Sequence, residues 1–129
     1  MAKGVRPPDH TLPRRMNASV QARVFRLVGL GIRGRGAVVG VQQVREGVKH
    51  NTVHLALVAT DASANSRDKI VPLLHARRVR FIEVPSASTL GAAVGREHTA
   101  VVGIVDRQLA TGILDLVKSD SVRPREEGV

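Results

Sequence analysis

The sequence predicts an α/β protein, a three-layer α/β/α sandwich with a four-stranded mixed sheet. Short apolar stretches of strand type alternate with longer stretches of helical spacing, in the order α-β-α-β-α-β-α-β-α. Hydrophobic residues make up 43% of the chain and aromatic residues only 2%, so the core is expected to consist of Val, Leu, Ile and Ala. One domain is predicted over residues 17–118, between a disordered basic arm at 1–16 and a flexible polar tail at 119–129.

The first half of the domain is predicted to contain two helices separated by a short strand. Asn17 or Ser19 can cap the first helix, because a short side-chain oxygen there accepts from free backbone N–H groups. Apolar residues of this helix recur at helical spacing: Val20, Val24, Leu27, Val28 and Ile32. Glycines over Gly29–Gly34 weaken its last turns and help to end it. A short strand over Ala37–Val39 then leads into a helix over Gln42–Val48.

The second half of the domain alternates strands and helices. A near-continuous apolar run over Val53–Thr60 predicts a central strand covered on both faces. Asp61 and Ser63 are suitable caps for a helix over Ala64–Arg77, in which Pro72 removes one hydrogen bond and should kink the axis. The remaining elements are predicted to be a strand over Val79–Val84, a helix over Ser88–Val94 closed by Gly95, a strand over Thr99–Val105 and a helix over Gln108–Lys118.

Charge and composition limit the classes of ligand that the protein is expected to bind. Twenty Lys and Arg oppose eleven Asp and Glu, and the formal charge of +9 is typical of a protein that binds RNA or DNA. The alternative is a basic soluble protein without a polyanionic partner. The scarcity of aromatic residues argues against base-stacking platforms. The chain has no cysteine, and its histidines show no metal-ligand spacing, so no metal or cofactor is expected.

Catalytic and membrane functions are not indicated. No serine occupies a nucleophile elbow, and no carboxylate pair has a spacing suited to acid–base catalysis, so the protein is not expected to be an enzyme. The longest apolar runs are too short to span a bilayer, and no apolar segment follows the basic N-terminal residues as in a signal peptide. A cytoplasmic location is expected.

Residues around the second predicted helix are suited to recognise RNA. Gln42 and Gln43 lie in its first turn, where their amides can donate to and accept from a base edge. Several cations lie near them in the sequence and would hold phosphate groups: Arg33, Arg35, Arg45 and Lys49. The alternative is a glycine-rich turn followed by an ordinary solvated helix.

Several segments occur in an order and spacing found in a known family: Gly29–Leu30, Val38–Gly40, Leu55–Ser63, Leu90–Glu97 and Ala100–Val105. Through them, residues 29–118 resemble the bacterial YlxQ-like branch of the kink-turn-binding ribosomal-protein superfamily, which includes archaeal ribosomal protein L7Ae and its L30e relatives. The resemblance implies the same sandwich fold and a non-enzymatic protein that binds structured RNA.

The resemblance also implies particular contact residues. In kink-turn binders, a Gly-x-Asn-Glu-x-x-Lys pattern at the start of the second helix reads sheared G·A pairs and phosphate. Gly40 matches the glycine, Gln42 the asparagine and Gln43 the glutamate, whereas Glu46 stands at the lysine position, where it reverses the charge facing a phosphate. The loop Arg96–Thr99 stands where archaeal members place apolar residues against a flipped-out base.

The sequence therefore predicts a non-enzymatic protein that binds kink-turn-like or ribosomal RNA. The glutamines would contact base edges and the cations would hold the backbone, which gives these contact residues: Arg33, Arg35, Gly40, Gln42, Gln43, Arg45, Lys49 and Arg96. Two alternatives belong to other classes, a protein-interaction module and an accessory substrate-binding subunit of an RNA-modifying enzyme. No membrane, metal or cofactor is expected as a partner.

Overall fold

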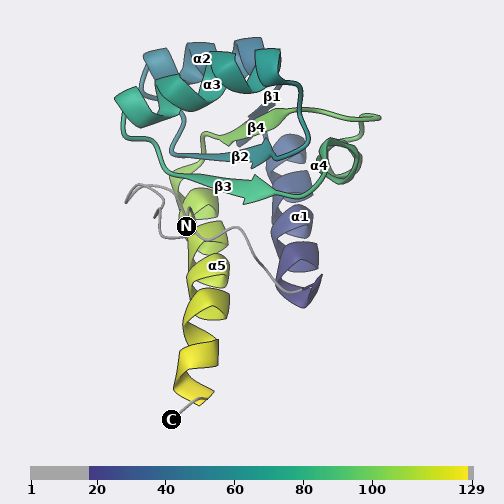
Figure 1. Ribbon diagram of the computed structural model, residues 1–129, viewed down its shortest axis with the longest axis vertical. Coiled ribbons are helices and arrows are strands. Elements are labelled where there is room, and N and C mark those ends of the chain that lie inside the picture. Colours follow the sequence, from purple (N-terminus) through teal and green to yellow (C-terminus); the bar gives the residue numbers. More distant parts are fainter. Residues whose placement is uncertain (1–17, 128–129) are drawn as a thin grey trace, which may run out of the picture.

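The computed structural model describes the backbone of residues 18–127 and the side chains of residues 18–118. In this part of the chain, five helices surround a four-stranded mixed sheet (Figure 1). The elements are α1 (Ala18–Arg33), β1 (Ala37–Val39), α2 (Val41–Lys49), β2 (Leu55–Ala59), α3 (Ala64–Ala76), β3 (Phe81–Val84), α4 (Ala87–Ala93), β4 (Val101–Ile104) and α5 (Arg107–Glu127). The predicted fold class and element order are confirmed. The predicted basic arm at 1–16 and the possible cap Asn17 lie outside the described residues.

The strand order is β1-β4-β2-β3, with β2 parallel to β3 and antiparallel to β4, and β4 antiparallel to β1. Strands β1, β2 and β3 therefore run in the same direction. Helices α2, α3 and α4 all begin where these three strands finish, and we call this the glutamine end of the sheet (residues 40–43, 60–63, 85–87 and 95–100). Helices α1, α2 and α3 finish at the opposite, arginine end (residues 33–36, 49–54, 77–80 and 105–107).

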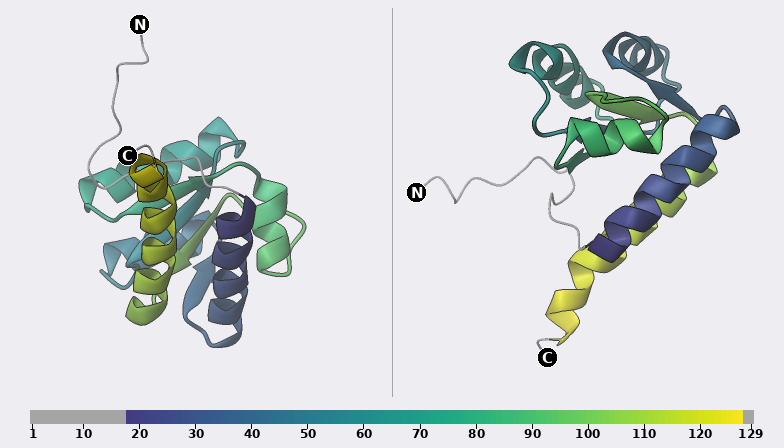
Figure 2. Two further views of the ribbon diagram at one scale, coloured as in Figure 1. Left: turned by 90° about the horizontal axis from the view of Figure 1, so that it is seen from below. Right: turned by 90° about the vertical axis from the view of Figure 1, so that its right-hand side faces the viewer.

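Two apolar cores fill the spaces between the three layers. Helices α1, α4 and α5 pack on one face of the sheet, and α2 and α3 cover the other (Figures 1 and 2). All five residues of β2 are buried, and their side chains alternate between the two cores. The central, doubly covered strand predicted from the apolar run is therefore confirmed. No helix in the described part of the chain is both long and apolar enough to cross a bilayer.

Two of the predicted helix caps need correction, and a third is confirmed. Ser19 lies inside α1 and does not cap it, since the described helix begins at Ala18. Ser63 is the N-cap of α3, where its hydroxyl accepts from Ser66 N at 3.1 Å. Asp61 instead accepts from Ala87 N at 2.7 Å, so its carboxylate holds the start of α4 rather than the start of α3.

Helix α5 is longer than predicted. The structure continues it to Glu127, whereas the polar composition beyond Lys118 suggested a frayed tail. Residues 119–123 contain neither glycine nor proline, so nothing in them stops a helix that the preceding apolar residues have established. The helix then also includes Pro124, although a proline normally interrupts a helix. Pro72 likewise lies inside α3 without ending it.

Candidate nucleic-acid interface

The turn between β1 and α2 is built on Gly40. Its φ of 99° and ψ of 156° lie in a region that only glycine adopts at low cost. Its N–H donates to Val101 O at 3.0 Å, and its carbonyl accepts from Val44 N at 3.0 Å. Because glycine has no capping side chain, the first backbone N–H groups of α2 have no hydrogen-bond partner among the described residues. The helix therefore starts with free donors and the positive end of its dipole at the glutamine end.

Gln42 and Gln43 are exposed in this first turn, because α2 buries its opposite face. Val44 and Val48 are fully buried against the sheet and fix the rotation of the helix. The two amides are thus presented beside the free backbone donors. Together they offer both donors and acceptors to a ligand at the same place.

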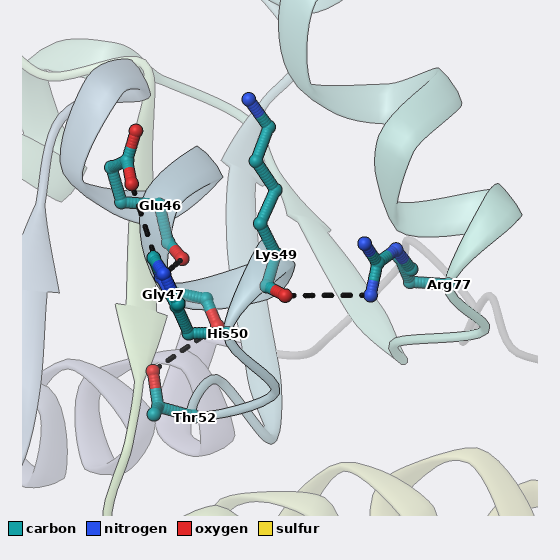
Figure 3. Close-up of polar contacts among 6 residues, drawn as sticks. All are labelled: Glu46, Gly47, Lys49, His50, Thr52 and Arg77. Atoms are coloured by element: carbon teal, nitrogen blue, oxygen red, sulfur yellow. Dashed lines mark hydrogen bonds and ion pairs between the residues drawn. The ribbon is translucent and has the colours of Figure 1, made fainter.

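Glu46 follows one turn later on the exposed side of α2. Its carboxylate lies 3.8 Å from His50 Nδ1, and the same ring nitrogen is 2.8 Å from Glu46 O (Figure 3). The side chain of Glu46 is 59% exposed, so the carboxylate remains open to solvent. It places a negative charge between the glutamines and Lys49, at the position where the related pattern has a lysine.

The loop between α4 and β4 is folded back onto α4. Arg96 N donates to Gly91 O at 2.8 Å, and Thr99 N donates to Ala87 O at 3.0 Å. A Cβ on Gly91 would lie 2.4 Å from His98 Cα, so only a glycine permits this close packing. The side chains of Arg96, Glu97 and His98 are consequently exposed at the glutamine end.

One carbonyl joins this loop to the start of α2. Val101 O accepts both from Gly40 N, at 3.0 Å, and from the hydroxyl of the buried Thr99, at 3.3 Å. Both segments are therefore anchored to the first residue of β4. The segments that carry the glutamines and Arg96 are thus held by one strand, although more than fifty residues of sequence separate them.

The predicted contact residues do not form a single cluster. Gly40, Gln42, Gln43 and Arg96 lie at the glutamine end, whereas Arg33, Arg35 and Lys49 lie at the arginine end. Residues close in sequence are separated because β1 runs from the arginine end to the glutamine end and α2 runs back. Lys49 follows Gln42 by seven residues of helix, which is about 10 Å.

Arg45 has a structural partner. It is half-buried between α2 and α3, and its Nη1 donates to the carbonyl of Lys69. This bond ties the two helices of one layer together. The sequence pattern gave no sign of it, since the partner lies 24 residues away.

Sequence reasoning also missed residues at both ends. At the glutamine end, Thr60 Oγ1 donates to Pro85 O at 3.2 Å, so the turn after β2 lies beside the turn after β3. At the arginine end, the exposed residues Arg77, Arg78 and Arg80 follow α3. Thr60 and Pro85 could have been found from the two apolar strands that precede them, because parallel pairing of these strands brings their carboxyl ends together. The three arginines could have been found from the basic run that they form in the sequence between a helix and a strand.

The two ends differ in charge. Among the described side chains at the glutamine end, exposed Arg96 is offset by exposed Asp61 and Glu97. Nearby Arg67 is engaged, since its Nη2 lies 3.0 Å from Glu83 Oε2 and its Nη1 donates to Ala59 O. The positive charge is concentrated at the arginine end. Within residues 18–118, no three acidic or histidine side chains come together as a metal site requires.

The chain belongs to the Ribosomal protein L7Ae/L30e/S12e/Gadd45 family, whose pattern matches residues 24–113. It is similar to the RNA-binding protein YlxQ of Bacillus subtilis (strain 168), with 30% identity over 93 residues that cover 72% of this chain and 93% of that protein. The family resemblance expected from the sequence is therefore confirmed.

Two solved structures share the architecture. A protein with unknown function from Bacillus halodurans C has a TM-score of 0.69 and 25% identity, and the match covers 75% of this chain and 98% of that chain. The Giardia lamblia 15.5kD RNA binding protein has a TM-score of 0.71 and 18% identity, covering 90% of this chain and 98% of that chain. At this identity the second match supports the fold alone.

Proposed function

We propose that this protein binds structured RNA in the cytoplasm, without catalysis, and that the glutamine end reads the RNA. The observation that carries the proposal is the joint display of Gln42, Gln43 and free helix-start N–H groups beside the Arg96 loop. The family, the relative described as an RNA-binding protein and the formal charge of +9 support the same ligand class.

Each component has a distinct task. The free N–H groups at the start of α2 donate to a phosphate oxygen, helped by the helix dipole. The amides of Gln42 and Gln43 pair with base edges, which are accessible where an RNA internal loop unstacks its bases. The Arg96 guanidinium holds a neighbouring phosphate. The target class is an internal loop of the kink-turn or ribosomal kind, flanked by double helix.

Replacing Gln43 with alanine is expected to relax discrimination between RNAs. Loss of one base-edge contact should reduce the preference for an internal-loop RNA over plain duplex by about 1–3 kcal/mol. Gln108→Ala is the matched control, because Gln108 is also an exposed glutamine in the first turn of a helix, α5, away from the glutamine end. Fluorescence anisotropy titrations of both variants measure the effect. The proposed role of Gln43 is contradicted if the two variants show the same preference.

Replacing Glu46 with lysine is expected to raise RNA affinity by about threefold to tenfold at low salt, because it removes a negative charge near the RNA backbone and adds a phosphate contact. The slope of log affinity against log salt concentration should steepen by about 0.7–0.9 for that contact. Asp115→Lys makes the same change of charge at an exposed position of α5 and is expected to have a smaller effect. An equal gain from both variants would show that only net charge matters.

A further inference from the structure

We infer that the arginine end is a second RNA contact, which grips the backbone of a double-helical segment without reading its sequence. The contact consists of six of the seven Lys and Arg residues at this end, those from three helix ends and the segment before β3: Arg33, Arg35, Lys49, Arg77, Arg78 and Arg80. This contact rests on the proposed function, because it adds phosphate contacts to the few that the α2 N–H groups and Arg96 make at the nearly neutral glutamine end.

The six cations keep nitrogen atoms available for an anion. Five of the side chains have no hydrogen-bond partner among the described residues, and Arg77 uses one guanidinium nitrogen to donate to Lys49 O. All six residues are exposed, and none of their side chains forms an ion pair with another described residue. Two carboxylates belong to neighbouring segments and both have partners. Glu46 lies beside His50, and Asp106 Oδ1 accepts from Leu109 N at 2.9 Å at the start of α5. The cations outnumber these two carboxylates, so the arginine end keeps a net positive charge within the described part of the protein.

The sheet spaces these cations to suit a double helix. Arg35 precedes β1 and Arg80 precedes β3, and these strands are the outer two of the order β1-β4-β2-β3. Three strand spacings separate them by about 14 Å. Between α2 and α3, Arg77 Nη1 donates to Lys49 O at 3.4 Å and brings the two helix ends together (Figure 3). A row of this length can contact phosphates on both sides of the wide, shallow groove of an RNA double helix.

The backbone at two of these positions is an independent observation. Arg35 and Arg78 have φ angles of 61° and 58°, in the left-handed region that normally holds glycine after a helix. Each helix end is closed around its arginine, by Gly36 N donating to Gly31 O and by Val79 N donating to Leu74 O. Glycine would serve the fold at lower cost, so a role outside the fold accounts better for the arginines. Guanidinium groups are suited to phosphate because they donate in pairs.

The test uses the full chain and two RNAs, a plain duplex of about 16 base pairs and the same duplex with an internal loop. Binding is measured between about 50 and about 200 mM salt. The variant Arg78→Gln/Arg80→Gln is compared with Arg23→Gln/Arg26→Gln, which removes the same charge from exposed positions of α1. Lys49→Gln/Arg80→Gln repeats the test without changing a left-handed residue.

We expect both arginine-end variants to bind both RNAs about tenfold more weakly at low salt, with a log–log salt slope reduced by about 1.5, while the preference for the internal loop is kept. The α1 variant should lose less than about threefold. Unchanged affinity and slope in both arginine-end variants, or an equal loss in the α1 variant, would overturn the second contact. If the unmodified protein binds the two RNAs equally well, the proposed function is overturned instead. The measurements on the plain duplex would then still test the arginine end.

Discussion

Gly91→Ala is expected to lower the free energy of unfolding by about 1–3 kcal/mol, although alanine normally favours a helix over glycine by about 1 kcal/mol. The added Cβ would lie 2.4 Å from His98 Cα, 2.7 Å from His98 N and 2.8 Å from His98 C. These are backbone atoms, so they cannot rotate out of the way. The loop that carries Arg96 must move off α4, and RNA binding should weaken with it.

Thermal or urea unfolding measures this loss, and Gly112→Ala provides the control. Gly112 also lies in a helix, α5, but the nearest atom to its added Cβ is Leu27 Cδ1 at 4.0 Å. That substitution should leave stability unchanged or raise it by up to about 1 kcal/mol. If Gly91→Ala proves as stable as Gly112→Ala, the loop does not pack on α4 as described.

Gly40→Ala is expected to cost about 1–3 kcal/mol of stability and to reduce the preference for internal-loop RNA. No atom lies within 4 Å of the added Cβ, so the cost is conformational rather than a clash. At φ 99° an L-residue is strained, and relief of the strain would turn the first residues of α2. The two glutamines would then lose their fixed position beside the Arg96 loop.

Gly34→Ala separates this effect from a general effect of losing a glycine. Its Cβ would make an ordinary contact, 3.6 Å from Leu30 O, and its φ is not in the left-handed region. We expect this variant to keep both stability and RNA preference, as measured by unfolding and by titration. Equal behaviour of the two variants would contradict the proposed role of the β1–α2 turn.

The fold could be predicted from the sequence because its signals are local. The apolar run of β2 is long enough to indicate burial on both faces, and the helices show their period directly. The sequence defines the ends of elements less well, because the residues before and after Ser19 and Lys118 are both compatible with a helix. Tertiary packing decides such boundaries.

The site was only partly predictable because it depends on strand pairing. Arg35 and Gln42 are close in sequence, yet β1 places them at opposite ends of the sheet. Conversely, the hydrogen bonds of Gly40 and Thr99 to Val101 join segments that no local pattern connects. The position of Arg45 near the glutamines predicts a phosphate contact, because its spacing on α2 does not reveal that it faces α3.

Fixed glutamine amides should make this protein distinguish a distorted RNA from a regular one. Competition between an internal-loop RNA and its fully paired counterpart, at low ionic strength, measures that distinction directly. We predict that the loop-containing RNA displaces the paired one with at least about tenfold higher affinity, which corresponds to about 1.4 kcal/mol. Equal affinity for the two would contradict recognition by the glutamine end.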